Sequence, residues 1–216
     1  MRVLFNATIG RHNKLIDSAT PRHPSVKTGS ERDIPLSRTT IVIRQSIRRQ
    51  HMKLPAHQFL DDHGIPYRAV SFPPTTEKGA ANVAHALDFR EAQMVKTLIF
   101  ETATGTPALI MIAANRSAVS GHLKKALGSR NIKLASPETV KKITSYEIGS
   151  IPPFHWQPPG FVSLIDAALM FENELGVGAG VWGQEIIITP PNLVRASQAR
   201  IVNLSDKTQP VSPDSR

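Results

Sequence analysis

Two neighbouring apolar runs carry the clearest structural signal in the sequence: MVKTLIFE at residues 94–101 and PALIMIA at residues 107–113. The stretch TATGT at residues 102–106 separates them, and its small polar residues and glycine are typical of a turn. Short apolar runs bounded by turn residues are typical of strands in a sheet. We therefore predict two neighbouring antiparallel strands joined by a β-hairpin.

Further short helices and strands are predicted on both sides of the hairpin. The predicted helices lie near residues 55–63, 77–87, 119–127 and 137–144, with helical turns after residue 166 and from residue 190. The other predicted strands cover residues 67–72, 132–135, 161–165, 175–177 and 185–189. Because helices and strands do not alternate strictly, the pattern favours an α+β fold over a doubly wound fold. We expect a single domain with a mixed, largely antiparallel, barrel-like sheet surrounded by short helices.

Composition excludes several classes of protein. The 216 residues include no cysteine, which excludes a disulfide framework, a thiolate nucleophile and any zinc site built on thiolates. The longest uninterrupted apolar run, residues 108–114, is far shorter than the roughly 18–20 residues of a membrane-spanning helix. We expect a soluble, mostly folded protein without a membrane partner.

The net charge of +9 is concentrated in the first quarter of the chain. Residues 1–51 carry ten Lys or Arg against three acidic residues, whereas residues 52–216 carry sixteen against fourteen. This first segment has one aromatic residue and no sustained periodicity, so we predict a disordered basic leader. The folded domain is then expected at residues 52–203, followed by a polar tail at residues 204–216.

Three origins of the leader fit the sequence. Its arginine-rich, acid-poor character resembles a transit peptide. Alternatively, translation starts at Met52 and the upstream codons belong to an over-extended gene prediction. We favour this second origin, because Met52 immediately precedes the first clean helix signal. The third origin is a basic arm that contacts RNA phosphates.

Lys96 is the first residue that does not fit an ordinary core. By the two-residue period of a strand it shares a face with Met94 and Leu98, and the alternate residues are largely apolar too, so both faces are predicted to be buried. Burial of an unpaired ammonium is costly, so such a lysine is paired, reaches solvent with its head group, or binds an anion. Periodicity alone leaves the solvent-reaching lysine and the functional lysine equally open.

Two further features are candidates for a site. Asp166 ends a hydrophobic strand; it either caps the following turn, which is the simpler reading, or faces a cleft and holds a substrate ammonium or hydroxyl group. The loop at residues 149–160 is rich in glycine and proline and is expected to be stiff. Gly149 allows close approach of a ligand, and main-chain N–H groups nearby suit a carbonyl or an oxyanion, although an ordinary turn fits equally well.

Other apparent motifs do not fit their chemistry. GAGVWG at residues 178–183 matches the dinucleotide fingerprint, but a strand-like run follows it where the fingerprint needs a helix. The eight histidines show no helical metal pairing, and no Gly-x-Ser-x-Gly elbow is present. We therefore expect no metal site and no cofactor.

Four blocks of the folded part, in their order and spacing, resemble the YbaK/ProX family of aminoacyl-tRNA editing domains. The blocks are VKTLIF (residues 95–100), LASPE (134–138), YEIGSIPPF (146–154) and LID (164–166), and the runs at 176–180 and 190–193 continue the likeness. The resemblance covers about residues 52–203. Two departures leave the amino-acid specificity open: Ser150 stands where many members have a second glycine, and Pro152 precedes Pro153.

The resemblance implies an enzyme that hydrolyses the ester of mischarged tRNA in trans; related domains are inserted in some prolyl-tRNA synthetases. The implied partners are the acceptor end of a mischarged tRNA and an aminoacyl-tRNA synthetase, with the cytoplasm as the location and no cofactor. The implied catalytic residues are Lys96, Gly149 and Asp166, and the implied substrate-binding residues are Ser150, Ile151 and Pro153.

Two other functions stay open at this point. One is a non-catalytic module that binds tRNA or a synthetase and kept the fold but lost turnover, with Ser150 and Pro152 as traces of that loss. The other is a hydrolase of small esters unrelated to RNA.

Overall fold

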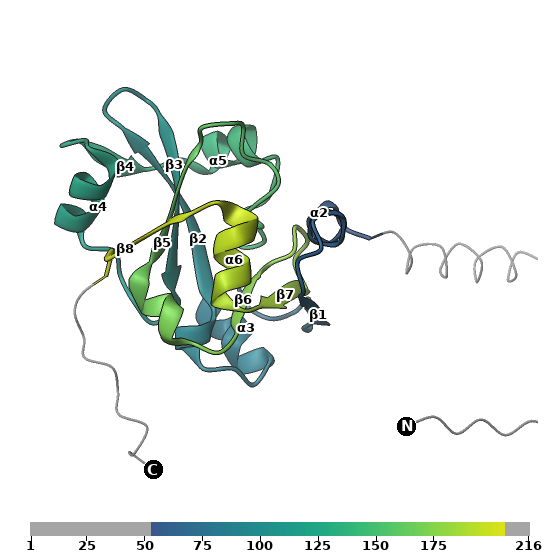
Figure 1. Ribbon diagram of the computed structural model, residues 1–216. Coiled ribbons are helices and arrows are strands. Elements are labelled where there is room, and N and C mark those ends of the chain that lie inside the picture. Colours follow the sequence, from purple (N-terminus) through teal and green to yellow (C-terminus); the bar gives the residue numbers. More distant parts are fainter. Residues whose placement is uncertain (1–52, 206–216) are drawn as a thin grey trace, which may run out of the picture. The chain divides into compact units, whose positions relative to one another are not determined.

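The computed structural model describes residues 53–205, which are coloured in Figure 1. The predicted leader and most of the predicted tail therefore lie outside the described residues. The helices are α2 (Pro55–Asp62), α3 (Ala80–Ala86), α4 (Ser120–Leu127), α5 (Pro137–Thr144) and α6 (Pro190–Ser197), with 3-10 turns η1 (Glu91–Gln93) and η2 (Ala167–Phe171). The strands are β1 (Arg68–Ser71), β2 (Val95–Thr102), β3 (Pro107–Ala113), β4 (Ile132–Leu134), β5 (Val162–Asp166), β6 (Leu175–Gly178), β7 (Gln184–Ile188) and β8 (Arg200–Val202).

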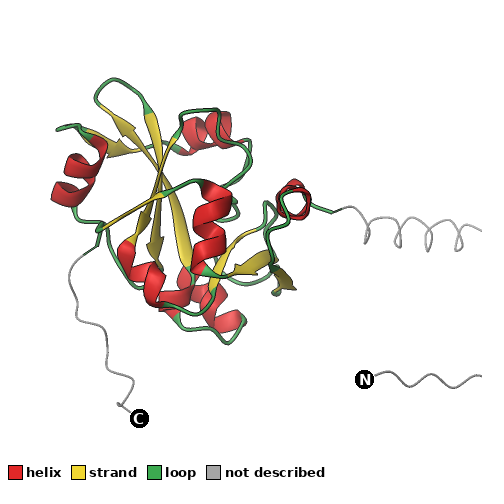
Figure 2. Cartoon of the chain, in the orientation of Figure 1, coloured by secondary structure: helices red, strands yellow, loops and turns green. Residues whose placement is uncertain are grey.

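The strands form two sheets (Figure 2). The larger sheet has the order β4-β2-β3-β5-β8, and the smaller has the order β1-β7-β6. β2 is antiparallel to β3 and β4, and β7 is antiparallel to β1 and β6, whereas β5 runs parallel to β3 and β8. The predicted hairpin is confirmed: Val95 pairs with Ala113 and Glu101 pairs with Pro107.

An isolated bridge joins the two sheets just before β2, where Met94 pairs in parallel with Gly176 of β6. A β-carbon on Gly176 would lie 2.1 Å from the Met94 sulfur, so the two chains approach this closely only because position 176 has no side chain. The α+β fold with a mixed, largely antiparallel sheet is confirmed. The barrel-like description holds only loosely, because the described strands form two sheets that do not close.

Both faces of the central strands are covered, as the apolar runs predicted. On one face, α2, α5, α6 and the smaller sheet enclose the main core, to which β2, β3 and β5 contribute Ile99, Met111 and Ile165. On the opposite face, Leu123 of α4 packs with Ile112 of β3. Alternate residues of one strand thus face different cores, because successive strand residues point to opposite sides.

The last part of the domain differs most from the prediction. α6 has eight residues rather than a single turn, and its two prolines occupy the first turn, where N–H groups have no partner within the helix. The short edge strand β8 was not predicted. The rejection of the dinucleotide fingerprint is supported, because the strand β7 follows residues 178–183. Among the described helices, none is long and apolar enough to cross a lipid bilayer.

Candidate active site

Lys96 lies in β2, and its half-buried side chain leaves the sheet on the same face as Leu98. Its Nζ donates a hydrogen bond to the main-chain carbonyl of Arg116, in the segment that follows β3. Burial lowers the pKa of the Lys96 ammonium, and the Glu91 carboxylate partly opposes this effect. The amine is thus bonded to the main chain of the protein. This disfavours the interpretation that Lys96 merely extends its head group into solvent.

Asp166 ends β5 and is 1% exposed. Its carboxylate accepts a hydrogen bond from the Leu204 N–H at 3.1 Å and another from the Ser205 hydroxyl. It makes no side-chain cap on the following turn, so the simpler reading of Asp166 is wrong. Arg116 Nη1 donates to Ser205 Oγ at 3.3 Å. Ser205 therefore links Asp166 to Arg116, whose carbonyl holds Lys96.

Lys96 and Asp166 lie in one row across the larger sheet. Lys96 pairs with Ile112. Met111 pairs with Ile165 in the parallel β3–β5 pair, so one residue further along Ile112 lies beside Asp166. Residues in one row of a sheet point to the same face. The structure thus brings the predicted lysine and aspartate onto one face, with one strand between them.

The glycine–proline loop reaches the same face from the side of β6. Met94 pairs in parallel with Gly176, so the start of β2, where Lys96 lies, runs beside β6, which contains Gly178. A β-carbon on Gly178 would lie 2.7 Å from the Ser150 carbonyl carbon, so the Ser150 main chain covers this face of β6. The loop therefore lies on β6, the neighbour of the strand that carries Lys96.

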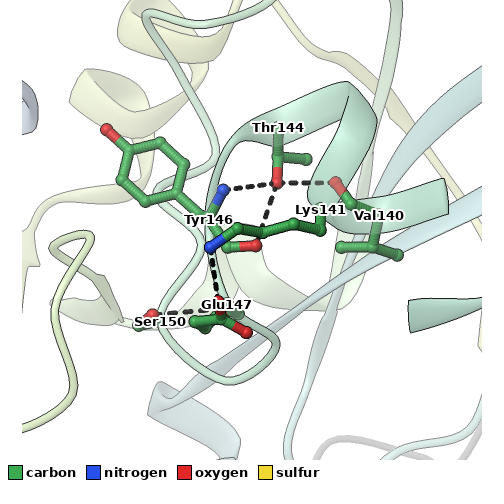
Figure 3. A network of polar contacts seen from close by, with 6 residues as sticks. All are labelled: Val140, Lys141, Thr144, Tyr146, Glu147 and Ser150. Carbon is green, nitrogen blue, oxygen red and sulfur yellow. Dashed lines mark hydrogen bonds and ion pairs between the residues drawn. The ribbon is translucent and has the colours of Figure 1, made fainter. Parts of the chain in front are cut away.

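The start of the loop is anchored to the end of α5 (Figure 3). The Ser150 hydroxyl and the Ser150 N–H both donate to the Glu147 carbonyl, at 3.1 and 3.2 Å. The Glu147 carboxylate forms an ion pair with Lys141 of α5. The Thr144 hydroxyl accepts a hydrogen bond from the Tyr146 N–H at 3.0 Å and closes the helix end. Ser150 is thereby held in place by the helix that precedes it.

Side chains from later in the loop brace its prolines. Trp156 Nε1 donates to the Pro152 carbonyl at 2.6 Å, and Gln157 Nε2 donates to the Pro153 carbonyl at 2.8 Å. Ile151 and both prolines are buried, and Ile151 belongs to the main core. These contacts agree with the stiffness expected from the composition of the loop.

Gly149 has a φ of +96°, a left-handed conformation that glycine adopts without strain. A β-carbon at this position would lie 3.4 Å from the Lys78 side chain and 3.4 Å from the Trp182 ring. The Lys78 amine lies over that ring, 4.2 Å from its centroid. A cation and an aromatic surface therefore border the outer side of the loop.

Sequence reasoning missed Glu185. This residue of β7 pairs with Gly178, so it lies one strand beyond the position that the loop covers. It is 7% exposed, and burial raises the pKa of its carboxyl to about 8. The signal was available, because Glu185 precedes the apolar run Ile186–Ile188. The argument applied to Lys96, a charged residue in an apolar strand, would have found it.

Two other places carry no part of this site. Among residues 53–205, no three His, Asp or Glu side chains are grouped as a metal ion would require. An open depression near the β2–β3 turn is lined by residues such as Glu101 and Lys133, and it includes none of the predicted site residues.

Comparison with known proteins identifies the family. The sequence profile described as the aminoacyl-tRNA editing domain matches residues 75–196, more than half of the chain. The chain belongs to this family. The matched region of the editing domain contains Lys96, the loop from Gly149 onward and Asp166.

The curated relatives of this editing domain are the multifunctional Ser/Thr-tRNA deacylases ProXp-y of Escherichia coli K12 and O157:H7. Each is 31% identical over 97 residues, which make up 44% of this chain and 57% of the relative. The chain thus spans little more than half the length of these relatives. A crystal structure of a protein proposed to be a trans-editing enzyme for prolyl tRNA synthetase has a TM-score of 0.63 and 24% identity, over 70% of this chain and 98% of that one. This likeness shows a shared fold.

Proposed function

We propose that this protein hydrolyses the ester bond of mischarged aminoacyl-tRNA and acts in trans on the free charged tRNA. Membership of the editing-domain family supports this function. The observation that carries it is that Lys96 shares a face of the sheet with Asp166, in a strand whose start adjoins β6, where the Ser150 main chain lies against Gly178. A cation and main-chain donors on one face are suited to an ester next to a phosphate.

Lys96 binds the terminal phosphate or the ester carbonyl of the charged tRNA. An ammonium group has three N–H donors, and the Arg116 carbonyl takes one of them. The other donors are available for an anionic or carbonyl oxygen. Because the amine is half-buried, water screens its attraction less than it would at an open surface.

Main-chain N–H groups near Gly149 stabilise the oxyanion that develops as water attacks. The Ser150 N–H is already bonded to the Glu147 carbonyl at 3.2 Å. The N–H groups of Gly149 and Ile151 make no hydrogen bond within residues 53–205. These two groups are therefore the donors that we assign to the oxyanion.

Asp166 acts as a positioning residue. Its two oxygens accept hydrogen bonds from the Leu204 N–H and the Ser205 hydroxyl, and the carboxylate is 1% exposed. Through Ser205 it fixes Arg116, which orients the amine of Lys96. Asp166 therefore positions Lys96 rather than contacting the substrate, in place of the catalytic role that the family resemblance implied.

The reaction itself makes modest demands on the protein. The ester of an aminoacyl-tRNA is already reactive, so a positioned water, assisted by the neighbouring ribose hydroxyl, is a sufficient nucleophile. The buried residues Ser150, Ile151 and Pro153 form a stiff wall that selects the amino acid by size. Such a second sieve is useful because a synthetase separates amino acids that differ by one methylene by only about 1–3 kcal/mol.

The partner is the acceptor end of the tRNA rather than its whole body. Residues 52–216 have a surplus of only two positive charges, which gives weak general attraction to a phosphate backbone. Lys78 provides positive charge beside Gly149 of the loop, and Lys96 provides it on the neighbouring strand β2. We include an aminoacyl-tRNA synthetase as a second partner, which would deliver the mischarged product.

A deacylation panel tests the function. The full chain is incubated with charged tRNAs, cognate and mischarged, and loss of the ester is followed for each. Seryl- and threonyl-tRNA come first, because the curated relatives are named for them. We expect at least one mischarged tRNA to be cleaved well above its spontaneous rate, with Lys96→Ala inactive. Binding of tRNA or a synthetase without cleavage would establish the non-catalytic module instead, and equal activity on free aminoacyl esters would establish the small-ester hydrolase.

A further inference from the structure

Glu185 is a buried carboxyl group for which the mechanism above has no use. It lies in β7 between Val70 of β1 and Gly178 of β6, and it is 7% exposed. Its carboxyl makes no hydrogen bond or ion pair with any residue that the structure describes, and neither oxygen is completely enclosed. The carboxyl group is therefore unpaired, but a ligand that enters from solvent can contact it.

The side chain of Glu185 leaves the sheet on the face that the loop covers. Gly176, Met94 and Ile187 meet on this face, because a β-carbon on Gly176 would contact the side chains of the other two. Glu185 is two residues before Ile187, so it points to the same side. The paired residue Gly178 is covered there by the Ser150 main chain. Glu185 thus lies beside the loop, one strand beyond Gly178.

The cations of the site do not compensate this carboxyl. The Lys96 amine binds the Arg116 carbonyl, and the Lys78 amine lies over the Trp182 ring. Burial alone raises the pKa of the Glu185 carboxyl to about 8. An unpaired buried carboxyl is costly to ionise, and a cation placed next to it reverses that cost.

The proposed substrate carries such a cation. Every aminoacyl ester has an α-ammonium group, two bonds from the carbonyl that water attacks. β7 and the start of β2 both lie next to β6, and adjacent strands are about 4.8 Å apart, so the main chains of β7 and β2 are about 10 Å apart where the two sheets meet. An aminoacyl-ribose unit spans a distance of this order between its ammonium group and its phosphate.

We propose that Glu185 binds the α-ammonium group of the aminoacyl-tRNA, while Lys96 holds the phosphate or carbonyl end. This inference rests on the proposed function and adds a residue that recognises the aminoacyl group common to all substrates. On binding, the carboxyl proton is released to solvent and the carboxylate forms an ion pair with the ammonium. No bond of the ester changes in this step.

The test replaces the ammonium of the substrate by a neutral group of similar size. The charged tRNA cleaved fastest in the panel is deaminated with nitrous acid to the α-hydroxyacyl-tRNA, and kcat/KM is measured for both esters and corrected for spontaneous hydrolysis. The full chain, Glu185→Gln and the matched control Glu174→Gln are compared. Glu174 is partly exposed and paired with Arg68 at 3.0 Å, so its replacement makes the same chemical change elsewhere.

We expect the wild type and Glu174→Gln to have a higher kcat/KM for the ammonium ester than for the hydroxy ester. In Glu185→Gln, kcat/KM for the ammonium ester should fall by about tenfold to a hundredfold, while kcat/KM for the hydroxy ester should stay unchanged. An equal loss on both esters would overturn the proposal, since it would indicate a structural role. If Glu185→Gln fails to fold, the wild type decides alone: equal kcat/KM for the two esters overturns the proposal. If the wild type cleaves no charged tRNA, the proposed function itself fails, and the inference fails with it.

Discussion

The main chain of Ser150 lies against Gly178, so closely that a β-carbon on Gly178 would come within 2.7 Å of the Ser150 carbonyl carbon. The Gly180 N–H donates to the Ser150 carbonyl at 2.8 Å, which ties the loop to the chain after β6. A glycine in the strand is what lets the loop settle on the same face as Lys96. The position of the loop is therefore set by the absence of one side chain.

Gly178→Ala is expected to displace the loop. The obstacle to the new methyl group is main chain rather than a flexible side chain, so the free energy of unfolding should fall by about 1–3 kcal/mol. Deacylation should slow by about 10- to 100-fold, because the oxyanion donors move. Urea unfolding and single-turnover deacylation measure the two effects.

Gly121→Ala is the control for this change. Gly121 lies in α4, and a β-carbon there meets no atom within 4 Å. Alanine should stabilise the helix by roughly 0.5–1 kcal/mol and leave deacylation unchanged. Equal deacylation rates for both variants would show that the loop takes no part in the reaction.

Lys96→Met should remove most of the activity. Methionine keeps most of the length of the side chain but has no charge and no N–H donor, so the phosphate or carbonyl loses its partner. Loss of one such donor lowers the deacylation rate by about 10²–10³-fold. Lys133→Met is the matched control, since Lys133 is an exposed residue paired with Glu101 at 3.3 Å. Full activity of Lys96→Met in a steady-state assay would refute the role of the amine.

Asp166 and Ser205 should be energetically coupled. Asp166→Asn weakens the hydrogen bonds from Ser205 and Leu204, and Ser205→Ala removes one of them and the contact with Arg116. Each change should lower the free energy of unfolding by about 1–3 kcal/mol. Because the two residues share one contact, the double variant should lose less than the sum, by about 0.5–3 kcal/mol in a urea-unfolding cycle. Additive losses would mean that this link does not form in solution.

The Glu185 carboxyl should make stability depend on pH. Its pKa is raised from 4.5 to about 8 by burial. Between these values the unfolded chain has released the proton and the folded chain keeps it, so the free energy of unfolding falls as the pH rises. The slope is about 1.4 kcal/mol per pH unit at most. The protonated carboxyl stabilises the folded chain fully below the ordinary pKa, and this stabilisation is lost as the pH rises through the raised pKa.

Urea unfolding of the wild type and Glu185→Gln at several pH values between about 5 and 8 measures this effect. The free energy of unfolding of Glu185→Gln should increase steadily relative to that of the wild type as the pH rises. A difference that stays constant over this range would mean that Glu185 ionises as it does in the unfolded chain.

Much of the fold could be predicted from local pattern. The β2–β3 hairpin, the helix begun by Ser136 and Pro137, and the strand at residues 162–166 follow from apolar runs, capping residues and turn residues. The strand β8 was missed because three residues at a sheet edge carry too little pattern to be recognised. Its place is set by pairing with β5, which lies more than thirty residues earlier in the chain.

The candidate site was predicted in part. Lys96 and the loop from Gly149 stood out because a cation in an apolar strand and a cluster of glycine and proline both depart from the pattern around them. Glu185 departs in the same way but went unnoticed. What Asp166 does could not be predicted, because its donors, Leu204 and Ser205, lie 38 and 39 residues further along the chain.

By itself, the sequence determined most of the segments that are strands and helices, excluded thiol chemistry, and marked Lys96 as a residue in need of a partner. Tertiary structure alone decided that this partner is the main-chain carbonyl of Arg116. It also decided that the Asp166 carboxylate accepts a hydrogen bond from Ser205 and that Gly178 lies against the Ser150 main chain. The reason is physical: a side-chain period encodes which face a residue points to, but sheet register and main-chain carbonyls, which are the same for every residue type, decide what it meets there.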